Sequence, residues 1–560
     1  MGTAASPSKA ERIKARSRGL RGALAAATTD GAAAFEGESV ALLKFHGVYQ
    51  GYDRDSATER KQRGLEKLHQ LMVRVRIPAG RLTAAQYLAL DALADRTGNG
   101  TLRLTTRQSI QFHGVLKGDL KETIAAIDAS LLTTLAACGD VVRTVTSVAA
   151  PIRDVVHRRL EEDARRLSGH LLPSTGAYHE IWLDGERVGG ADEDALYGAT
   201  YLPRKFKIGL ATPEDNSVDV LTNDLGIVAL FEGDQLQGYN FALGGGLGMT
   251  HNNARTFPRL ASFVAFVAPQ DLLPAAAAAV MLHRDHGDRG DRRHARLKYV
   301  IAEHGDAWAK ARLEGYLGKK LEEPRAMPAF RVRDHLGWHE QGDGRLYLGV
   351  PIPSGRIQGA HRRALREAIE RFGLDPIISP TQDLILSNAV PGDRAAIEGM
   401  LRTSGVTLAD ELSPARRWSL ACPALPSCGL ALTEAERVQH PMISAIEAAL
   451  ARQNLADETL SIRITGCPNG CARPYAGDIG IVGRMPGHYA IYVGGDFAGT
   501  RLNFPLLDRV AEMDVAASLE PLFARFAAER APNEGFGDYC HRMGKERLLA
   551  ALAPQLEEAS

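Results

Sequence analysis

Four cysteines in the C-terminal part of the chain have spacings that could hold metal. Cys422 and Cys428 stand in C-P-A-L-P-S-C, and Cys467 and Cys471 stand in T-G-C-P-N-G-C. Four thiolates are the ligand set of one cubane iron–sulfur cluster. The second pair stands at i and i+4, so a helical turn would place both sulfurs on one face. We therefore interpret these four residues as the ligands of a [4Fe–4S] cluster.

Two other uses of these thiols stay open at this point. Zinc sites usually contain pairs separated by two to four residues, whereas the first pair here is C-x5-C. Disulfides are typical of small secreted domains, and six cysteines in 560 residues without a secretory signal do not fit that pattern. A cluster is favoured over both. Cys138 and Cys540 are left over, and we interpret them as buried small apolar groups or idle thiols.

The composition excludes several classes of protein. The chain has 67 basic and 67 acidic residues, which argues against a nucleic-acid binder because such proteins usually carry a basic excess. No apolar run is long enough to span a membrane. The length predicts three or four domain-sized units. We expect a cytoplasmic protein with neither a nucleic-acid nor a membrane partner.

An internal duplication sets the order of the elements that must position the cysteines. Four segments recur in the same order: V-R-I-P-A-G-R-L at Val75–Leu82 and V-P-I-P-S-G-R-I at Val350–Ile357, Leu104–Phe112 and Ile378–Leu386, Asp224–Val228 and Asp478–Val482, and Tyr239–Gly245 and Tyr489–Gly495. Self-similarity of this kind decides the architecture before any local prediction. We expect two related halves.

Each copy is predicted to run strand, helix, strand. Apolar alternation at Leu71–Ile77 indicates a strand with one basic face. Thr83 is a plausible N-cap for a helix over Ala84–Ala94, and Leu102–Phe112 alternates again. Strands and helices that mix without strict alternation predict an α+β fold with mixed or antiparallel sheets.

Basic residues interrupt several of these apolar segments. They are Arg74, Arg76, Arg103, Arg107, Arg143, Arg204, Lys205 and Lys207. A buried cation is costly unless a counter-charge accompanies it, yet the four segments that carry these eight residues contain no acid. A solvated strand face would explain any one of them. Together they favour an anionic ligand, because arginine can hold a carboxylate through two hydrogen bonds.

A glycine-rich run, G-G-G-L-G at Gly244–Gly248, follows a predicted strand. It lacks the G-x-G-x-x-G order of a dinucleotide loop. We expect Gly244 and Gly245 to allow close backbone approach to a bound cofactor. No flavin or nicotinamide site is evident, so the reducing equivalents would come from another protein.

At the cysteine motifs the chain resembles the siroheme-dependent sulfite and nitrite reductases. The resemblance runs from about Glu11, through Lys44-Phe45-His46-Gly47, to Gly535-Phe536-Gly537-Asp538, and so covers nearly the whole chain. Within this family the chain is most similar to haemoprotein (beta) subunits of NADPH-dependent assimilatory sulfite reductases. The family fold has two related halves around a pseudo-twofold axis with the cofactor between them.

The resemblance implies a reaction and a set of site residues. The reaction is the six-electron reduction of sulfite to sulfide at siroheme coupled to the cluster, with Cys471 as a ligand of both. Arg74, Arg143, Lys205 and Lys207 match the residues that hold the substrate anion. The residues matched or assigned to siroheme are Arg103, Arg107, Gln111, His113, Arg204, Gly244, Gly245, Gln382, Asn469 and Arg473. His113 alone would be weak evidence, because a histidine on a strand is more often structural.

The resemblance also implies a domain order and a partner. We expect an N-terminal arm over residues 1–62, partly disordered, that docks an NADPH-dependent flavoprotein. Half-domains of ferredoxin-like type follow at 63–145 and 336–410. The siroheme and substrate domain is expected at 146–335, and the cluster domain at 411–560. A ferredoxin-dependent sulfite or nitrite reductase stays open as the alternative, and a zinc-bearing scaffold is the non-catalytic one.

Overall fold

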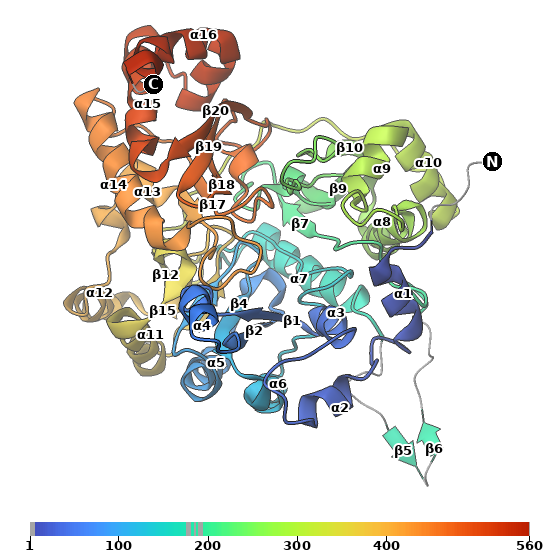
Figure 1. The fold of residues 1–560 in the computed structure, drawn as a ribbon. Coiled ribbons are helices and arrows are strands. Elements are labelled where there is room, and N and C mark those ends of the chain that lie inside the picture. Colours follow the sequence, from blue (N-terminus) through green and yellow to red (C-terminus); the bar gives the residue numbers. More distant parts are fainter. Residues whose placement is uncertain (1–5, 175–180, 184–185, 189–193, 559–560) are drawn as a thin grey trace.

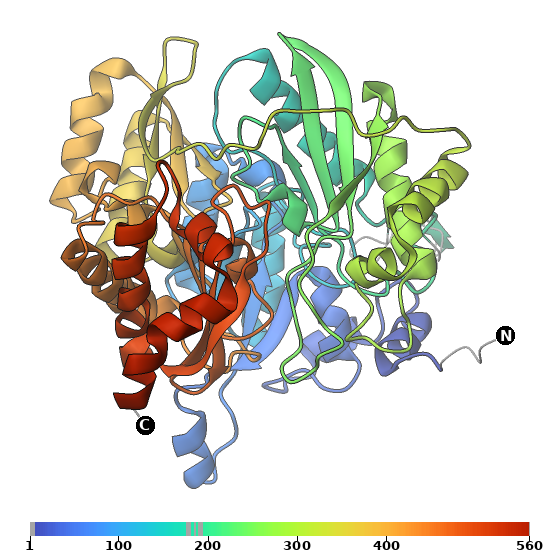
Figure 2. The same cartoon turned by 90° about the horizontal axis from the view of Figure 1, so that it is seen from above.

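The computed structural model describes residues 6–174, 181–183, 186–188 and 194–558. Two half-domain sheets (blue and yellow) and two later sheets (green, and orange to red) pack around a shared centre (Figure 1). Seen from above, the green and red parts lie on opposite sides of that centre (Figure 2). This arrangement confirms the predicted α+β fold with two related halves. None of the described helices is long and apolar enough to span a bilayer.

The two half-domains have sheets of the orders β1-β2-β4-β3-β13 and β11-β12-β15-β14. The strands are β1 (Val48–Tyr52), β2 (His69–Arg74), β3 (Leu102–Leu104), β4 (Ile110–Val115), β11 (Gly337–Glu340), β12 (Leu346–Val350), β13 (Arg356–Ile357), β14 (Asp375–Ile378) and β15 (Leu384–Ala389). The covering helices are α5 (Ala84–Thr97), α6 (Leu120–Ala129), α11 (Gly359–Phe372) and α12 (Arg394–Thr403). Apolar residues of both half-domains form one continuous core.

Helix α5 begins where the sequence predicts. The Thr83 side chain accepts a hydrogen bond from the Gln86 backbone N at 3.2 Å, and the Gln86 side chain accepts from the Thr83 N at 3.1 Å. This reciprocal pair satisfies two of the free donors at the helix start. The helix ends at Thr97, later than the predicted Ala94.

The duplicated V-x-I-P-x-G-R segments adopt the same backbone conformation in both halves. Ala79 and Ser354, at matched positions, both have a φ of 53°. Each segment then reaches into the other half: β13 pairs with β3, and Arg81 forms an isolated antiparallel bridge with Ile377 of β14. The exchange is reciprocal, as a pseudo-twofold relation requires.

The two later sheets repeat each other as well. Their orders are β10-β9-β8-β7 and β16-β17-β18-β19-β20. The strands are β7 (Ile208–Ala211), β8 (Leu225–Glu232), β9 (Gln235–Leu243), β10 (Ser262–Val267), β16 (Ser419–Ala421), β17 (Ile462–Thr465), β18 (Ile479–Met485), β19 (His488–Val493) and β20 (Phe504–Ala511). The helices are α7 (Val155–His170), α8 (Leu272–His286), α9 (Leu297–His304), α10 (Asp306–Leu317), α13 (Pro414–Arg417), α14 (Glu436–Arg452), α15 (Val515–Glu529) and α16 (Phe536–Glu558), and β5 (Ile181–Leu183) and β6 (Glu186–Val188) form a separate pair.

A hydrogen bond that recurs in both sheets establishes which residues of the two sheets correspond. β7 runs parallel to β8, and β17 runs parallel to β18. The Asp224 carboxylate accepts from the Lys207 backbone N at 2.9 Å, and the Asp478 carboxylate accepts from the Ser461 N at 2.8 Å. Lys207 therefore corresponds to Ser461.

The N-terminal region differs from the mobile arm that its composition predicts. Its described part folds into α1 (Lys9–Arg16), α2 (Leu24–Thr29), α3 (Ser39–Leu42) and α4 (Ala57–Gln62). Ile13, Leu20 and Leu42 belong to the same apolar core as the domain that follows. A few apolar residues are enough to pack this region onto the body of the protein, because they lie on the side that faces it.

Candidate functional site

The two cysteine motifs meet at one edge of the second later sheet. Cys422 follows β16 directly and Cys467 follows β17 closely, and the two strands are parallel. The carboxyl ends of parallel strands share one edge of a sheet, so both thiols lie there. Backbone N–H of Gly466 donates to the Cys422 Sγ at 3.3 Å, and Asn469 Nδ2 donates to the Cys467 Sγ at 3.5 Å. Cys467–Cys471 forms turns, not the helical turn that the spacing suggested.

The four thiols lie close enough to perturb one another. Burial raises the pKa of Cys467 to about 12, with a further rise from the neighbouring Cys471. Burial also raises the pKa values of Cys422 and Cys428, and again Cys471 adds to both. Such thiols keep their protons until a metal displaces them.

The structure bears on the two alternatives to a cluster. All six cysteines are free, so none of them forms a disulfide. In the described ranges, no three His, Cys, Asp or Glu side chains are grouped tightly enough to hold a single ion. A cubane binds each thiolate through a different iron, so its ligands stand further apart than those of one zinc ion. The donor set of four thiols therefore fits a cluster.

A group of basic side chains adjoins the cysteines. Lys207 stands directly before β7, and its pKa falls to about 7 because of burial and the nearby guanidinium groups of Arg107 and Arg296, although Cys471 acts in the opposite sense. Burial, Lys207 and Arg204 also lower the pKa of Lys205 well below its usual value. Within the described residues neither lysine side chain forms a hydrogen bond or an ion pair. Asp224 acts on Lys207 but is itself paired with Arg296 at 2.8 Å, so neither lysine has an ion-pair partner of its own in the part of the chain that the structure describes.

Arg143 and Arg74 reach the same region from the first half. Arg143 Nε donates to the Gly139 O at 3.0 Å, its Nη1 donates to the Ala137 O at 3.2 Å, and its Nη2 faces the Tyr49 hydroxyl at 3.5 Å. Carbonyl partners hold the guanidinium without neutralising it, so its charge is still free for an anion. With the Gln111 amide turned so that its oxygen faces Arg74, that oxygen accepts a hydrogen bond from Arg74 Nε at 3.1 Å.

Several residues assigned to siroheme by resemblance have protein partners instead of open sides. Arg103 is fully buried; its Nε meets Glu436 at 3.1 Å and its Nη2 donates to the Ala421 O at 2.9 Å. It thereby ties β3 to the residue before Cys422. His113 Nδ1 accepts from Arg356 Nη2 at 3.2 Å, and burial holds its pKa well below the usual value, so the ring is neutral.

The glycine-rich run packs against protein backbone. A side chain at Gly245 would place its Cβ 2.2 Å from the Leu221 O, and one at Gly248 would lie 3.0 Å from the Asn469 O. Gly244 has a φ of +81°, which favours glycine. These contacts are one reason for glycine in the run, and the expected close approach to a cofactor stays a prediction. They also press this loop against the Cys467–Cys471 turn, where Met249 N donates to the Pro468 O at 2.9 Å.

The remaining predicted residues divide into two groups. Arg107 Nη1 donates to Asn223 Oδ1 at 2.6 Å while its Nε has no partner, and Gln382 Oε1 is likewise buried without a described partner. Both are polar atoms that a bound group could satisfy. Arg204 lies 3.8 Å from Asp140. Arg473 donates a hydrogen bond to the Pro380 O and pairs with Asp219.

Sequence reasoning missed a buried ionic network behind the cation group. Lys14 Nζ lies 2.5 Å from Glu11 and 3.7 Å from Asp140, and Asp140 accepts two hydrogen bonds from Arg292 at 2.6 and 2.8 Å. Burial alone would raise the pKa of Asp140, but Arg292 and Lys14 hold it below its usual value. Asp140 and Arg292 are far from Lys14 in the chain, so no local pattern could have revealed their contacts with each other and with Lys14.

Comparisons with known proteins agree with this geometry. The family model "Nitrite and sulphite reductase 4Fe-4S domain" matches residues 162–321 and 415–559, and "Nitrite/Sulfite reductase ferredoxin-like half domain" matches 63–130 and 339–403. The chain belongs to the nitrite and sulfite reductase family, whose cofactors are siroheme and a [4Fe–4S] cluster.

Two relatives and one solved structure show the range of the family. The chain is 46% identical to a "Sulfite reductase [NADPH] hemoprotein beta-component" of Myxococcus xanthus, over 96% of each chain. It is 43% identical to a "Sulfite reductase [ferredoxin]" of Synechococcus elongatus, over 97% of this chain and 90% of the relative. The Mycobacterium tuberculosis NirA structure shares the fold, with a TM-score of 0.78 and 23% identity over 97% of this chain and 98% of the other.

Proposed function

We propose that this chain is the haemoprotein component of an assimilatory sulfite reductase and reduces sulfite to sulfide with six electrons. The observation that carries the proposal is the juxtaposition of four mutually perturbing thiols with two buried lysines that form no ion pair within the described residues. Relatives named sulfite reductase, matched over nearly the full length, support it.

The residues present fit the two cofactors. Cys422, Cys428, Cys467 and Cys471 would hold the cluster, and Cys471 would also hold the siroheme iron. Arg107 and Gln382, each with a buried polar atom lacking a partner among the described residues, would bind siroheme at its polar periphery. When bound, the two cofactors supply the electrons and the iron at which sulfite is reduced.

The chain's own contribution is to bind the anion and supply protons. Arg143 and Arg74, held by neutral partners, together with Lys205 and Lys207, would offset the charge of sulfite. With a pKa of about 7, Lys207 can hold a proton at Nζ near neutral pH and release it to an oxygen that leaves as water.

The electron donor of this proposal is an NADPH-dependent flavoprotein. Helix α1 buries its apolar side and leaves Lys9, Arg12 and Arg16 exposed, which is a basic face that an acidic partner could dock. The Synechococcus relative favours ferredoxin as the second candidate donor. A cytoplasmic location belongs to the same proposal, since NADPH is a cytoplasmic reductant.

An assay of the reconstituted holoenzyme tests the reaction. With reduced methyl viologen and sulfite, one sulfide should form for each sulfite consumed, with absorption bands of siroheme in the purified protein. NADPH with the flavoprotein should replace methyl viologen better than reduced ferredoxin does. Turnover of nitrite alone, with none of sulfite, would move the chain to the nitrite reductases of the family.

We expect Arg143→Ala and Lys207→Ala each to reduce sulfite turnover about ten- to a hundredfold, because each removes one charge-assisted contact worth about 1.5–3 kcal/mol. Steady-state kinetics on protein with a measured siroheme content would show this. Lys319→Ala, an exposed lysine paired with Asp271 far from the site, is the matched control.

The pH dependence of sulfite binding provides a second test of Lys207. Since the pKa of Lys207 is lowered to about 7, its charge is present below that pH and lost above it, so the KM for sulfite should rise with pH. Lys207→Arg should move this rise to higher pH, because a guanidinium keeps its proton. Loss of siroheme from Arg143→Ala or Lys207→Ala without a kinetic defect per haem would assign these residues to cofactor binding.

A further inference from the structure

The duplication creates a second pocket related to the cation group by the pseudo-twofold axis. It is lined chiefly by Ser217, Thr381, Arg417, Ser461, Arg463 and Arg473, with the Trp418 ring as one wall. None of the four residues assigned to the substrate anion lines it. Nothing in the proposed reaction uses this pocket.

The register of the strands shows that this pocket is the counterpart of the substrate site. Thr146 forms a parallel bridge with Gly209, and Leu420 of β16 pairs in parallel with Arg463 of β17. Because Gly209 and Arg463 occupy matched positions in the two sheets, Thr146 corresponds to Leu420. Counting back from Thr146 and Leu420 brings Arg143 onto Arg417. In the matched segments Leu104–Phe112 and Ile378–Leu386, Arg107 corresponds to Thr381.

The counterpart of Cys471 is a serine. Ser217 and Cys471 stand the same number of residues before the matched Asp224 and Asp478. A hydroxyl does not replace a thiolate as a cluster ligand. The second pocket thus keeps the arginine of the substrate site but has lost the iron ligand, so it can bind an anion without reducing it.

Two of the three arginines of the pocket are paired with the same acid. Arg463 Nη1 lies 2.6 Å from Asp219, and Arg473 Nε lies 3.0 Å from the same carboxylate, so two buried guanidinium groups share one acid. Arg463 is 6% exposed, and its Nε has no hydrogen-bond partner among the described residues. Asp478 is close enough for Arg463 to lower its pKa against the effect of burial, but among the described residues the two form no ion pair, so Arg463 Nε stays available to a bound anion.

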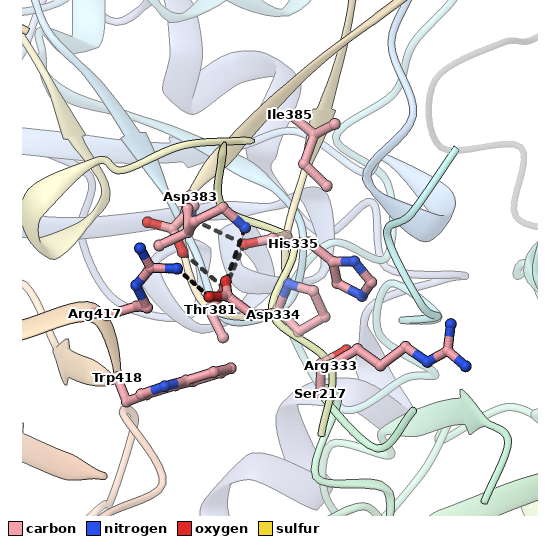
Figure 3. Close-up of a pocket in the computed structure, with 12 residues that line it drawn as sticks. Ser217, Arg333, Asp334, His335, Thr381, Asp383, Ile385, Arg417 and Trp418 are labelled. Carbon is pink, nitrogen blue, oxygen red and sulfur yellow. Dashed lines mark hydrogen bonds and ion pairs between the residues drawn. The ribbon is translucent and has the colours of Figure 1, made fainter. Parts of the chain in front are cut away.

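The third cation, Arg417, is neutralised by Asp334, which lies in the segment that links the two halves of the chain. Asp334 pairs with Arg417, and Figure 3 shows this ion pair beside Thr381, with the Trp418 ring close by. Asp334 thus places a carboxylate against the counterpart of Arg143. A bound anion would compete with it for the guanidinium.

We propose that this second pocket binds a small oxyanion of sulfite or sulfate size between Arg417, Arg463 and Arg473. Ser217, Thr381 and Ser461 offer hydroxyl donors around it. An oxyanion would accept several hydrogen bonds at once from these guanidinium and hydroxyl groups, and the Asp334 carboxylate would have to move away from Arg417 to make room for it. The site is separate from the proposed catalytic function and does not depend on it.

Calorimetric titration of the holoenzyme with selenate, a redox-stable oxyanion at neutral pH, tests the proposal. Wild-type protein should bind selenate in a step that leaves the haem absorption spectrum unchanged. Arg417→Gln should weaken that step about ten- to a hundredfold, because a charge-assisted contact is lost. Asp334→Asn should strengthen it, since the competing carboxylate is removed. Lys207→Met should leave it unchanged.

The paired variants make the result decisive. Arg417 is partly exposed, so its replacement is expected to fold, and thermal unfolding would confirm that it does. Crystals soaked in selenate should show anomalous scattering from selenium between Arg417 and Arg463. Binding that survives Arg417→Gln but is lost in Lys207→Met would assign the ion to the substrate site and overturn the proposal. Absence of any selenate step in both wild-type and Asp334→Asn protein would overturn it as well.

Discussion

Replacing Cys471 with serine is expected to abolish sulfite reduction. The thiol stands at the junction of the cysteine group and the cation group: it raises the pKa values of the other cluster cysteines and acts on Lys207. Loss of a residue behind a metal ligand already costs about ten- to a hundredfold, so loss of a shared ligand should cost more. Iron content, haem absorption and the electron paramagnetic resonance of the reduced cluster would all change.

Two comparisons make this expectation specific. Cys428→Ser removes a thiol that the proposal assigns to the cluster alone, so it should lower the cluster signal and retain more of the siroheme absorption. Cys540→Ala replaces a buried thiol of the C-terminal core and should change neither centre. An unchanged iron content in Cys471→Ser protein would refute the ligand assignment.

The sequence predicted those features that local chemistry determines. Thr83 with Gln86 marks the start of α5, and the repeated V-x-I-P-x-G-R segments predicted two halves that share a conformation at Ala79 and Ser354. The cysteine spacing predicted four thiols around one place. In each case the signal lies within a few neighbouring residues, which is the range over which capping and turn geometry act.

Side-chain partners across long sequence separations could not be predicted. Arg103 pairs with Glu436, and Arg463 shares Asp219 with Arg473. An arginine in an apolar strand can therefore be neutralised by an acid of another domain instead of by a ligand. Lys205 and Lys207 have the same kind of sequence context, but in the described part of the chain their side chains form no ion pair. Only the fold separates these two outcomes, because both leave the same pattern in the chain.

A protein shortened to begin at Glu36 is expected to lose much of its stability, and activity with it. The deleted segment contributes Ile13, Leu20 and Phe35, all buried, and each such side chain stabilises the fold by about 1.5–3 kcal/mol. It also contributes Lys14, whose loss leaves Asp140 with Arg292 but without its buried lysine partner. The sum is comparable to a typical unfolding free energy of about 5–15 kcal/mol.

The network also connects this segment to the chemistry. Asp140 lies 3.8 Å from Arg204, which directly precedes Lys205, and the Leu202 N donates to the Asp140 O at 3.1 Å. When Lys14 is absent, Asp140, still bonded to Arg292, would interact more strongly with Arg204 and shift the segment before β7 that carries Lys205 and Lys207. The shortened protein should therefore turn over sulfite at least about tenfold more slowly even with methyl viologen, since misplacing a catalytic group by about 1 Å can cost a hundredfold.

A pair of lysine replacements on one helix separates this structural role from partner docking. Lys14→Met should lower the melting temperature and the methyl viologen rate together. Lys9→Met, on the exposed side of the same helix, should leave both unchanged and weaken only the rate with NADPH and the flavoprotein, more so at low salt, because exposed charges are screened by ions. If the protein that begins at Glu36 keeps its melting temperature and its methyl viologen activity, the segment is the dispensable mobile arm that its composition suggests.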